Sequence, residues 1–509
     1  MISVQPPPCD AGVIHGAPPC DPAQTLSPGR KKLVLAATVL GSSLAFIDGS
    51  VVNVALPAIQ GALHADTVRT QWIVNAYLLM LGALVLIGGA AGDRYGRRRI
   101  YLTGIVAFAI ASVLCAFAQD AGTLIAARAL QGVGAALLVP GSLAILGATF
   151  PSNERGAAVG AWAGFAAIGG AIGPVLGGWL VDTISWRAIF LVNVPIAAVA
   201  VWLTLLAVPE SRQADAQQID WRGALLVAMG LGSLSFGLTY ASERGLGNPL
   251  VIAATVIGLL LLGAFLLQEN RARAPMMPLE LYRSGDFSGT NVLTLLLYFA
   301  LGGVFFFLPY ELIRLHGYSA TAAGASLLPF SFIMGTLSGA AGKLADRFGP
   351  RVPLTLGPLL AGAGFAAMSL PAPGQSYWTG LGPAIVVVAI GMTMAVAPLT
   401  STVMGAVPDG REGLASGINN AVARVAGLLA VAIMSLVFAQ VFLAHGSVGS
   451  TTDAHDILTR ALSGSGSLTP HSRDAFHAAF QAVLMTAAAC AVLGGLAAAV
   501  LVKKKRLAH

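Results

Sequence analysis

Residues 70–97 read TQWIVNAYLLMLGALVLIGGAAGDRYGR, an apolar stretch that ends abruptly in a charged hexapeptide. As a helix rising about 1.5 Å per residue, the apolar part, 70–91, is long enough to cross the roughly 30 Å hydrocarbon core of a bilayer. The hexapeptide at 92–97 combines charged residues with two glycines. This combination predicts a membrane-spanning helix that is followed by a short loop at the membrane surface.

The same alternation of long apolar stretches and short charged loops continues along the chain. The chain has 509 residues and a mean hydropathy of +0.78, and 10% of its residues are charged, against about 25% in soluble domains. This composition excludes soluble enzymes, nucleic-acid-binding domains and disordered proteins. It predicts an all-α polytopic membrane protein with fourteen transmembrane helices, near residues 33–58, 70–91, 100–118, 122–149, 156–181, 188–208, 222–242, 249–268, 287–312, 319–342, 352–371, 378–404, 413–443 and 476–502.

The positions of the basic residues predict the orientation of these helices. Lys and Arg gather before the first segment, in the loops after the second, sixth and eighth segments, and in the closing run 503–506. With fourteen crossings these regions lie on one side of the membrane, and loops rich in Lys and Arg stay in the cytoplasm. Both termini are therefore expected to be cytoplasmic. The net charge of +7 then needs no nucleic-acid partner.

A weak internal repeat predicts the grouping of the helices. The pattern Asp-Arg-aromatic-Gly occurs at 93–96 and again at 346–349, after the second and the tenth segment. Two six-helix halves in tandem would separate the copies by six segments, so a separation of eight indicates two inserted helices, a 6+2+6 arrangement that is typical of transporters with repeated halves. The expected domains are a disordered cytoplasmic tail at 1–32, a six-helix bundle at 33–208, an inserted two-helix hairpin with its flanking loops at 209–285, a second six-helix bundle at 286–502 and a basic cytoplasmic tail at 503–509.

Six motifs, in order along the chain, resemble those of the major facilitator superfamily. They are DGSVVNVALP at 48–57, GAAGDRYGRR at 89–98, RALQGVGA at 128–135, GGAIGPVLGG at 169–178, WRAIFLVNVP at 186–195 and ASGINNAVAR at 415–424. The first and the last two are similar to motifs of the fourteen-span drug:proton antiporters of this superfamily. The chain departs from the usual motifs at Ser50, Ala91 and Pro350, where relatives carry threonine, leucine and a basic residue.

The resemblance implies a major facilitator fold and a proton-coupled antiporter that exports lipophilic, cationic drugs or toxic compounds across the cytoplasmic membrane by alternating access. It implies proton-motive force in place of a cofactor, and a monomer whose partners are small-molecule substrates, protons and membrane lipid. Export of an endogenous metabolite or antibiotic by the same mechanism is the alternative. A membrane-embedded enzyme or receptor is disfavoured, because the sequence has no nucleophile–base constellation, nucleotide-binding loop or large soluble domain. The histidines have no metal-ligand spacing.

Asp48 is the most informative residue for this function. It lies 16 residues after Lys32 and 9 before Pro57, hence about 24 Å and 13 Å from the ends of its segment. An ionisable group at that depth is costly and faces a cavity or a partner. Arg128 reaches a similar depth from the other end of its segment, so we expect the two to be coupled, with proton and cationic substrate competing for Asp48. The alternative is two independent structural groups.

Two other charged residues lie within apolar segments. Glu311 follows the aromatic run 305–307, where it would attract flat cations through charge and cation–π contacts, or it pairs with Arg314 one helical turn away. Both interpretations are compatible with the sequence, and Glu311 is, with Asp48 and Arg128, a candidate for proton coupling and substrate binding. Arg424 is expected to be a structural pairing residue, because the resemblance places its helix away from the cavity.

Two of the motifs are expected to act in conformational change. In the loop motif, Gly89 and Gly96 permit tight packing, while Asp93 accepts hydrogen bonds at a neighbouring helix and the arginines bind carboxylates across the joint between the halves. The latch residues are then Gly89, Asp93, Arg94, Gly96 and Arg97. For the basic run, the alternative is positive-inside anchoring alone.

The motif at 169–178 predicts a kinked, close-packed helix. Pro174 removes one helical hydrogen bond, and the surrounding glycines let neighbouring backbones approach closely. The functional interpretation is a helix that seals or hinges the cavity between the halves, and the alternative is ordinary small-residue packing. The candidate residues of this antiporter motif are Gly169, Gly173, Pro174, Gly177 and Gly178.

Overall fold

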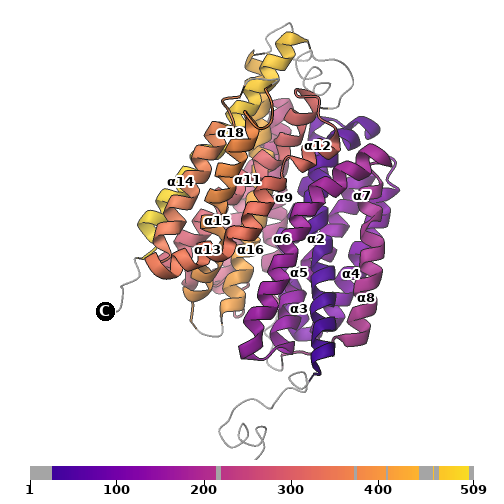
Figure 1. Ribbon diagram of the computed structural model, residues 1–509, viewed down its shortest axis with the longest axis vertical. Helices are drawn as coiled ribbons and strands as arrows, with labels where there is room; N and C mark the ends of the chain where they lie inside the picture. Colours follow the sequence, from indigo (N-terminus) through magenta and orange to yellow (C-terminus); the bar gives the residue numbers. More distant parts are fainter. Residues whose placement is uncertain are drawn as a thin grey trace, which may run out of the picture.

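The computed structural model describes residues 26–213, 219–371, 375–408, 411–445, 462 and 469–503, and within these ranges all regular structure is helical (Figure 1). Most of the tail predicted at 1–32 lies outside the described residues, as does nearly all of the tail at 503–509. The first described helix, α2, already begins at Pro28. The sequence therefore folds as the all-α protein that its composition predicts.

Each of the fourteen predicted segments corresponds to a helix or to two consecutive helices. The first group is α2 (Pro28–Leu63), α3 (Thr67–Tyr95), α4 (Arg97–Ala116), α5 (Ala121–Thr149), α6 (Ser152–Thr183), α7 (Ala188–Leu191), α8 (Asn193–Ala207), α9 (Trp221–Arg244) and α10 (Pro249–Arg271). After the 3₁₀ turn η2 (Leu279–Arg283) follow α11 (Gly285–Arg314), α12 (Ala320–Ala325), α13 (Leu328–Phe348), α14 (Arg351–Ala367), α15 (Leu381–Gly405), α16 (Glu412–His445) and α18 (Pro470–Leu501). Thirteen spans in the described part are long and apolar enough to cross a membrane, and α14, with 17 residues, is shorter.

Polar side chains set the starts of the helices. The Asp66 carboxylate accepts a hydrogen bond from the Arg69 N–H at 2.6 Å before α3, and Asp120 accepts one from the Thr123 N–H at 2.9 Å before α5. Such N-caps satisfy donors that the first turn leaves unpaired. These two helices therefore begin where a short polar residue interrupts the apolar sequence, whereas α4, α6, α13, α14 and α15 begin without a side-chain cap.

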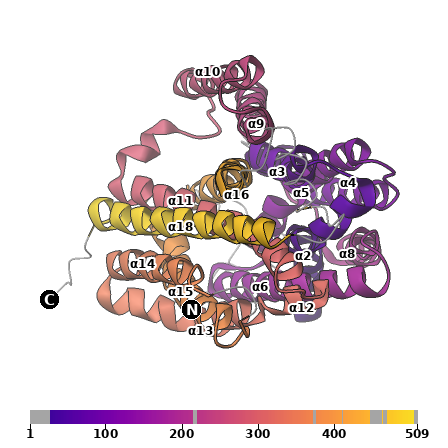
Figure 2. The same ribbon diagram turned by 90° about the horizontal axis from the view of Figure 1, so that it is seen from above.

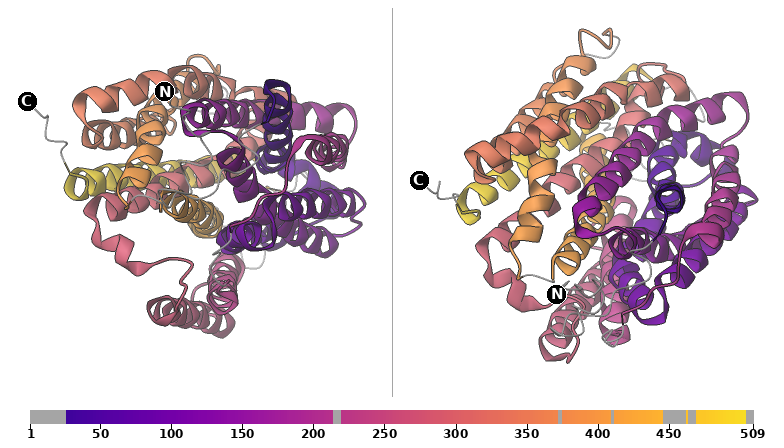
Figure 3. Two further views of the ribbon diagram at one scale, coloured as in Figure 1. Left: turned by 90° about the horizontal axis from the view of Figure 1, so that it is seen from below. Right: turned by 60° about the horizontal axis from the view of Figure 1, so that its bottom comes forward.

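The helices form two bundles with a hairpin beside them. Helices α2 to α8 pack on one another, and α11 to α18 form the second group. The pair α9–α10 lies at the periphery, with α9 against α3 and α16 (Figures 2 and 3). The two groups meet where α3 packs on α16 and where α6 packs on α12.

Candidate functional site

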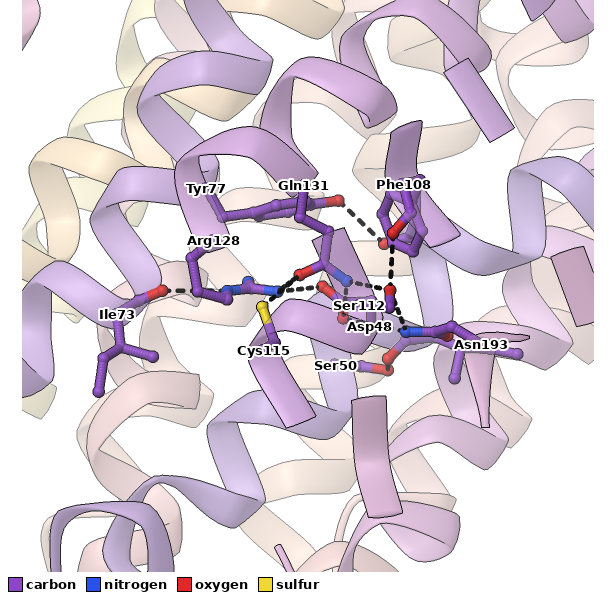
Figure 4. A network of polar contacts seen from close by, with 12 residues as sticks. Asp48, Ser50, Ile73, Tyr77, Phe108, Ser112, Cys115, Arg128, Gln131 and Asn193 are labelled. Atoms are coloured by element: carbon purple, nitrogen blue, oxygen red, sulfur yellow. Dashed lines mark hydrogen bonds and ion pairs between the residues drawn. The ribbon is translucent and has the colours of Figure 1, made fainter. Parts of the chain in front are cut away.

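An ion pair between Asp48 and Arg128 lies at the centre of the first bundle (Figure 4). Arg128 Nη1, on α5, donates to Asp48 Oδ2, on α2, at 2.5 Å, and both side chains are 1% exposed. The sequence predicted this coupling from the similar depths of the two residues and from the resemblance, which places both helices beside the central cavity, and the structure brings the two residues together. The opposite charges are close enough to compensate each other's loss of hydration.

Polar groups from two further helices complete the network around this pair. Gln131 Nε2 donates to Asp48 Oδ1 and to Ser112 Oγ, each at 2.9 Å, while Gln131 Oε1 accepts from Arg128 Nη1 at 2.6 Å. Asn193 Nδ2 lies 3.4 Å from both Asp48 Oδ1 and Ser112 Oγ. The sequence analysis missed these three residues, although Gln131 and Asn193 lie inside the quoted motifs.

The rest of the Arg128 side chain is also held in place. Its Nε donates to the Ile73 carbonyl at 3.1 Å, and its guanidinium lies 4.3 Å from the ring centre of Tyr77. Gly132, one turn further along α5, lies so close to α3 that an added Cβ would stand 2.5 Å from the Tyr77 carbonyl oxygen. The close approach of α5 to α3 fixes the guanidinium, so a proton arriving at Asp48 would change the charge of a preorganised site.

A cavity of about 170 Å³ separates the two bundles next to this network. Arg128 lines the cavity but Asp48 does not, because Arg128 and Gln131 cover its carboxylate. The opposite wall comes from α11 and α16 and includes Arg424. The expectation that Arg424 lies away from the cavity is therefore wrong: α16 packs along α3, and that contact turns the side chain toward the joint.

Glu311 lies elsewhere in the second bundle. Its Oε1 lies 2.9 Å from Nδ1 of His477, on α18, and 3.8 Å from Nε2 of His316. Burial lowers the pKa of His316, and the charges of His477 and Arg473 lower it further. Glu311 is absent from the cavity lining, whereas Phe305 and Phe306 belong to it. A direct contact between Glu311 and a cation in this cavity is therefore not supported.

The loop motif is held by residues of the first half. Asp93 Oδ1 accepts from Arg97 Nε at 2.8 Å, and Arg94 lies over the Tyr95 ring. Glu210, which the sequence analysis missed, accepts from the backbone N–H groups of Arg98 and Arg99 at 3.0 and 3.2 Å and so caps α4. Gly96 has φ +109°, a conformation that favours glycine, and a Cβ added at Gly89 would stand 3.6 Å from the Pro140 Cβ.

Asp93 is predicted to matter for turnover and hardly for stability. The Asp93–Arg97 pair is partly exposed, and such pairs contribute about 0–1 kcal/mol. We expect Asp93→Asn to reduce transport severalfold at unchanged abundance. The carboxylate is expected to stabilise the one conformation of the transport cycle in which the latch forms, and asparagine would weaken that conformation. Asp66→Asn, at the other end of α3, is the matched control, since asparagine also caps helices well. Equal export by the Asp93→Asn variant and the parent at equal protein levels would exclude the latch.

The glycine-rich motif of α6 faces two different helices. Gly173 and Gly177 lie against Ser50 and Val51 of α2, and Gly169 lies near Ile47. Gly178 instead abuts the Ala320 carbonyl of α12, while Gly324 of α12 abuts the Pro174 carbonyl. A side chain larger than hydrogen at Gly178 or Gly324 would therefore overlap the backbone of the other half.

Asp182 adds a polar contact at the same junction. Its carboxylate accepts from the N–H groups of Ala320 and Thr321 at 3.1 and 2.8 Å, and from the Thr321 hydroxyl at 2.6 Å. The sequence analysis did not single it out, because an acid at the end of a segment is common. The junction of Gly178, Gly324 and Asp182 closes one end of the joint between the halves.

Comparisons with known proteins agree with this architecture. The model of the Major Facilitator Superfamily matches residues 38–431. The chain is 32% identical to the tetracenomycin C resistance and export protein of Streptomyces glaucescens, over 84% of this chain and 79% of the relative. It is 36% identical to a puromycin resistance protein of Streptomyces alboniger, over 77% and 79%, and 34% identical to the multidrug resistance protein Stp of Mycobacterium tuberculosis, over 80% and 76%.

Solved structures show the same fold. A bacterial homologue of the human lysosomal transporter Spinster matches with a TM-score of 0.65 at 17% identity, covering 95% of this chain and 100% of that chain. A D-xylose–proton symporter matches with a TM-score of 0.63 at 16% identity, covering 93% and 98%. The relatives confirm the resemblance seen in the motifs, and they are transporters rather than enzymes. This chain, a multi-pass membrane protein, therefore belongs to the Major Facilitator Superfamily.

Proposed function

We propose that the protein is a proton-coupled antiporter that exports lipophilic drug-like compounds across the cytoplasmic membrane. The observation that carries this proposal is the buried Asp48–Arg128 network beside a cavity between the halves. Asp48 is the one acid of the described residues that lies far from the ends of its helix. Protonation changes the charge of this pair and so alters the groups that hold α2, α4 and α5 together.

The proposal includes a topology. Fourteen helices in a 6+2+6 arrangement, with the inserted pair α9–α10 at the periphery, would leave both termini in the cytoplasm. The end of the joint that Gly178, Gly324 and Asp182 close then faces outward. Among the described residues, no other helix comes within 4 Å of a Cβ added at Gly156, Gly160 or Gly164 of α6, or at Gly335, Gly339 or Gly342 of α13, and this loose packing supports an opening toward the cytoplasm.

Both the origin of the substrate and its charge remain to be assigned. Drug resistance and export of a self-made compound use the same mechanism, and the names include both resistance and export. The expectation of a cationic substrate stays a prediction. The cavity does not favour it, because the charged groups that line it are the arginines Arg128 and Arg424.

Proton release on drug addition tests the coupling. The purified protein would be reconstituted in liposomes with a pH-sensitive dye inside and an acidic exterior, and a panel of neutral, acidic and basic drugs would be added. A coupled exchanger is expected to move protons against the flux of at least one drug, and empty liposomes are the control. If no drug changed the proton flux although drugs crossed the membrane, the protein would be a facilitator and not an antiporter.

A further inference from the structure

The cavity between the halves has an excess of positive charge. Arg128 and Arg424 both line it, on opposite walls. The charge of Arg128 is balanced by Asp48, to which it is directly bonded. No other acid of the described residues lies in the middle of a helix, and Glu311 faces His477 instead. The positive charge of Arg424 is therefore the one in the cavity lining that no acid of the described residues compensates.

Arg424 has no hydrogen-bond or ion-pair partner among the described residues. The first atoms of its side chain pack against α3, where an added Cβ on Gly82 would stand 3.2 Å from the Arg424 Cβ. Tyr77 and Tyr298 line the same cavity as Arg424. A guanidinium without a partner is costly within a membrane protein, and charged groups kept there generally serve a ligand or a pathway.

We propose that Arg424 binds an oxygen acceptor of the transported compound, and that this compound is an acidic or uncharged aromatic molecule rather than a cation. The inference rests on the proposed export function and specifies its substrate class. A guanidinium presents a planar fork of donors that matches carboxylate, phenolate or carbonyl oxygens. Tyr298, Phe305 and Phe306 supply ring faces beside it for a flat molecule.

This assignment separates the substrate from the proton. The acceptor oxygen would sit on α16, in the second half, while the proton sits on Asp48, in the first half. The two ligands then do not compete for one carboxylate, and exchange works through the movement of the halves. Asp48→Asn is accordingly expected to remove proton coupling without weakening equilibrium binding of an acidic ligand, because Arg128, which lines the same cavity, keeps its charge while its counter-charge is lost.

Binding of three naphthalenes to the purified, detergent-solubilised protein tests the inference without a proton gradient. The probes are 2-naphthoate, 2-naphthamide and 2-naphthylmethylammonium, which share one ring system and differ in charge, and equilibrium dialysis measures their Kd. The parent protein is expected to bind the carboxylate and the amide more tightly than the ammonium. Arg424→Gln is expected to weaken naphthoate binding at least about tenfold, the effect of losing a charge-assisted hydrogen bond, and to spare the ammonium.

Two further variants keep the test decisive. Arg424→Lys preserves the charge but not the fork, so it is expected to bind naphthoate with intermediate affinity, and it serves if Arg424→Gln does not fold. Arg69→Gln removes an exposed charge on α3 and is the matched control. Tighter binding of the ammonium than of the carboxylate by the parent would overturn the inference, as would naphthoate binding that no Arg424 substitution alters. Correct probe preferences without any proton-coupled transport would leave the inference standing and overturn the proposed function.

Discussion

Asp48→Asn is expected to abolish proton-driven export, leaving only the passive leak of the membrane. Asparagine keeps the size of the side chain and its contact with Gln131, but it cannot exchange a proton. It also fixes the network in the state that a protonated carboxyl would have. The measurement is efflux of a transported drug from energised proteoliposomes, recorded together with proton release.

The loss of one buried charge needs a control for folding. Removing one member of a buried pair can cost about 3–5 kcal/mol, because Arg128 would remain without its counter-charge. The double variant Asp48→Asn/Arg128→Gln is therefore expected to recover stability without recovering proton-driven export. Asn75→Ser changes a buried polar residue outside the network and should export normally. Unchanged drug efflux and proton release in Asp48→Asn would show that the coupling site lies elsewhere.

Gly178→Val is expected to prevent closure of the outer end. The new side chain would overlap the Ala320 carbonyl and the Thr321 backbone of α12, atoms that cannot move without displacing the helix. Overpacking of this kind costs about 1–3 kcal/mol, which shifts an equilibrium between two conformations about five- to 150-fold. Transport should fall by a comparable factor, with the protein held open to the outside.

A cysteine at Ala320 reports this shift directly, because a membrane-impermeant maleimide can reach it only when α6 and α12 separate. The rate of labelling is expected to rise in Gly178→Val. Gly170→Val is the matched control, since Gly170 lies on the same helix and an added Cβ there meets nothing within 4 Å. Equal labelling and transport in the two valine variants would show that the contact between Gly178 and Ala320 does not control access.

The sequence predicted what depends on distance along a single helix. Asp48 and Arg128 could be paired because each lies at a depth that a rise of 1.5 Å per residue determines. The sides to which Glu311 and Arg424 point could not be predicted in this way. Both lie in helices that are apolar on nearly every face, so hydrophobic periodicity does not separate cavity, lipid and neighbouring helix.

Contacts between distant segments explain the remaining differences. Glu311 faces His477, which lies 166 residues later in the chain, and Arg424 is directed by packing of α16 on α3. Gln131, Ser112 and Asn193 each look like an ordinary polar residue in an apolar segment. The fold brings Gln131 and Asn193 to the Asp48 carboxylate and places Ser112 against both of them. For the proposed two-helix insertion, by contrast, the sequence offers a signal of its own, the changed spacing of a repeated loop, and the peripheral position of α9–α10 agrees with the proposal.

The Asp182 junction differs from the Asp48 network in what happens when it separates. Asp182 and the amides of α12 lie at the surface, so water replaces each lost protein hydrogen bond, and the net cost per bond is small. Separating these hydrogen bonds therefore costs little free energy, whereas Asp48 and Arg128 are each 1% exposed and would lose their partners far from solvent. The contact between Asp182 and α12 can therefore open and close reversibly. Modest differences in ligand or proton occupancy are enough to shift the equilibrium between the closed and the open conformation.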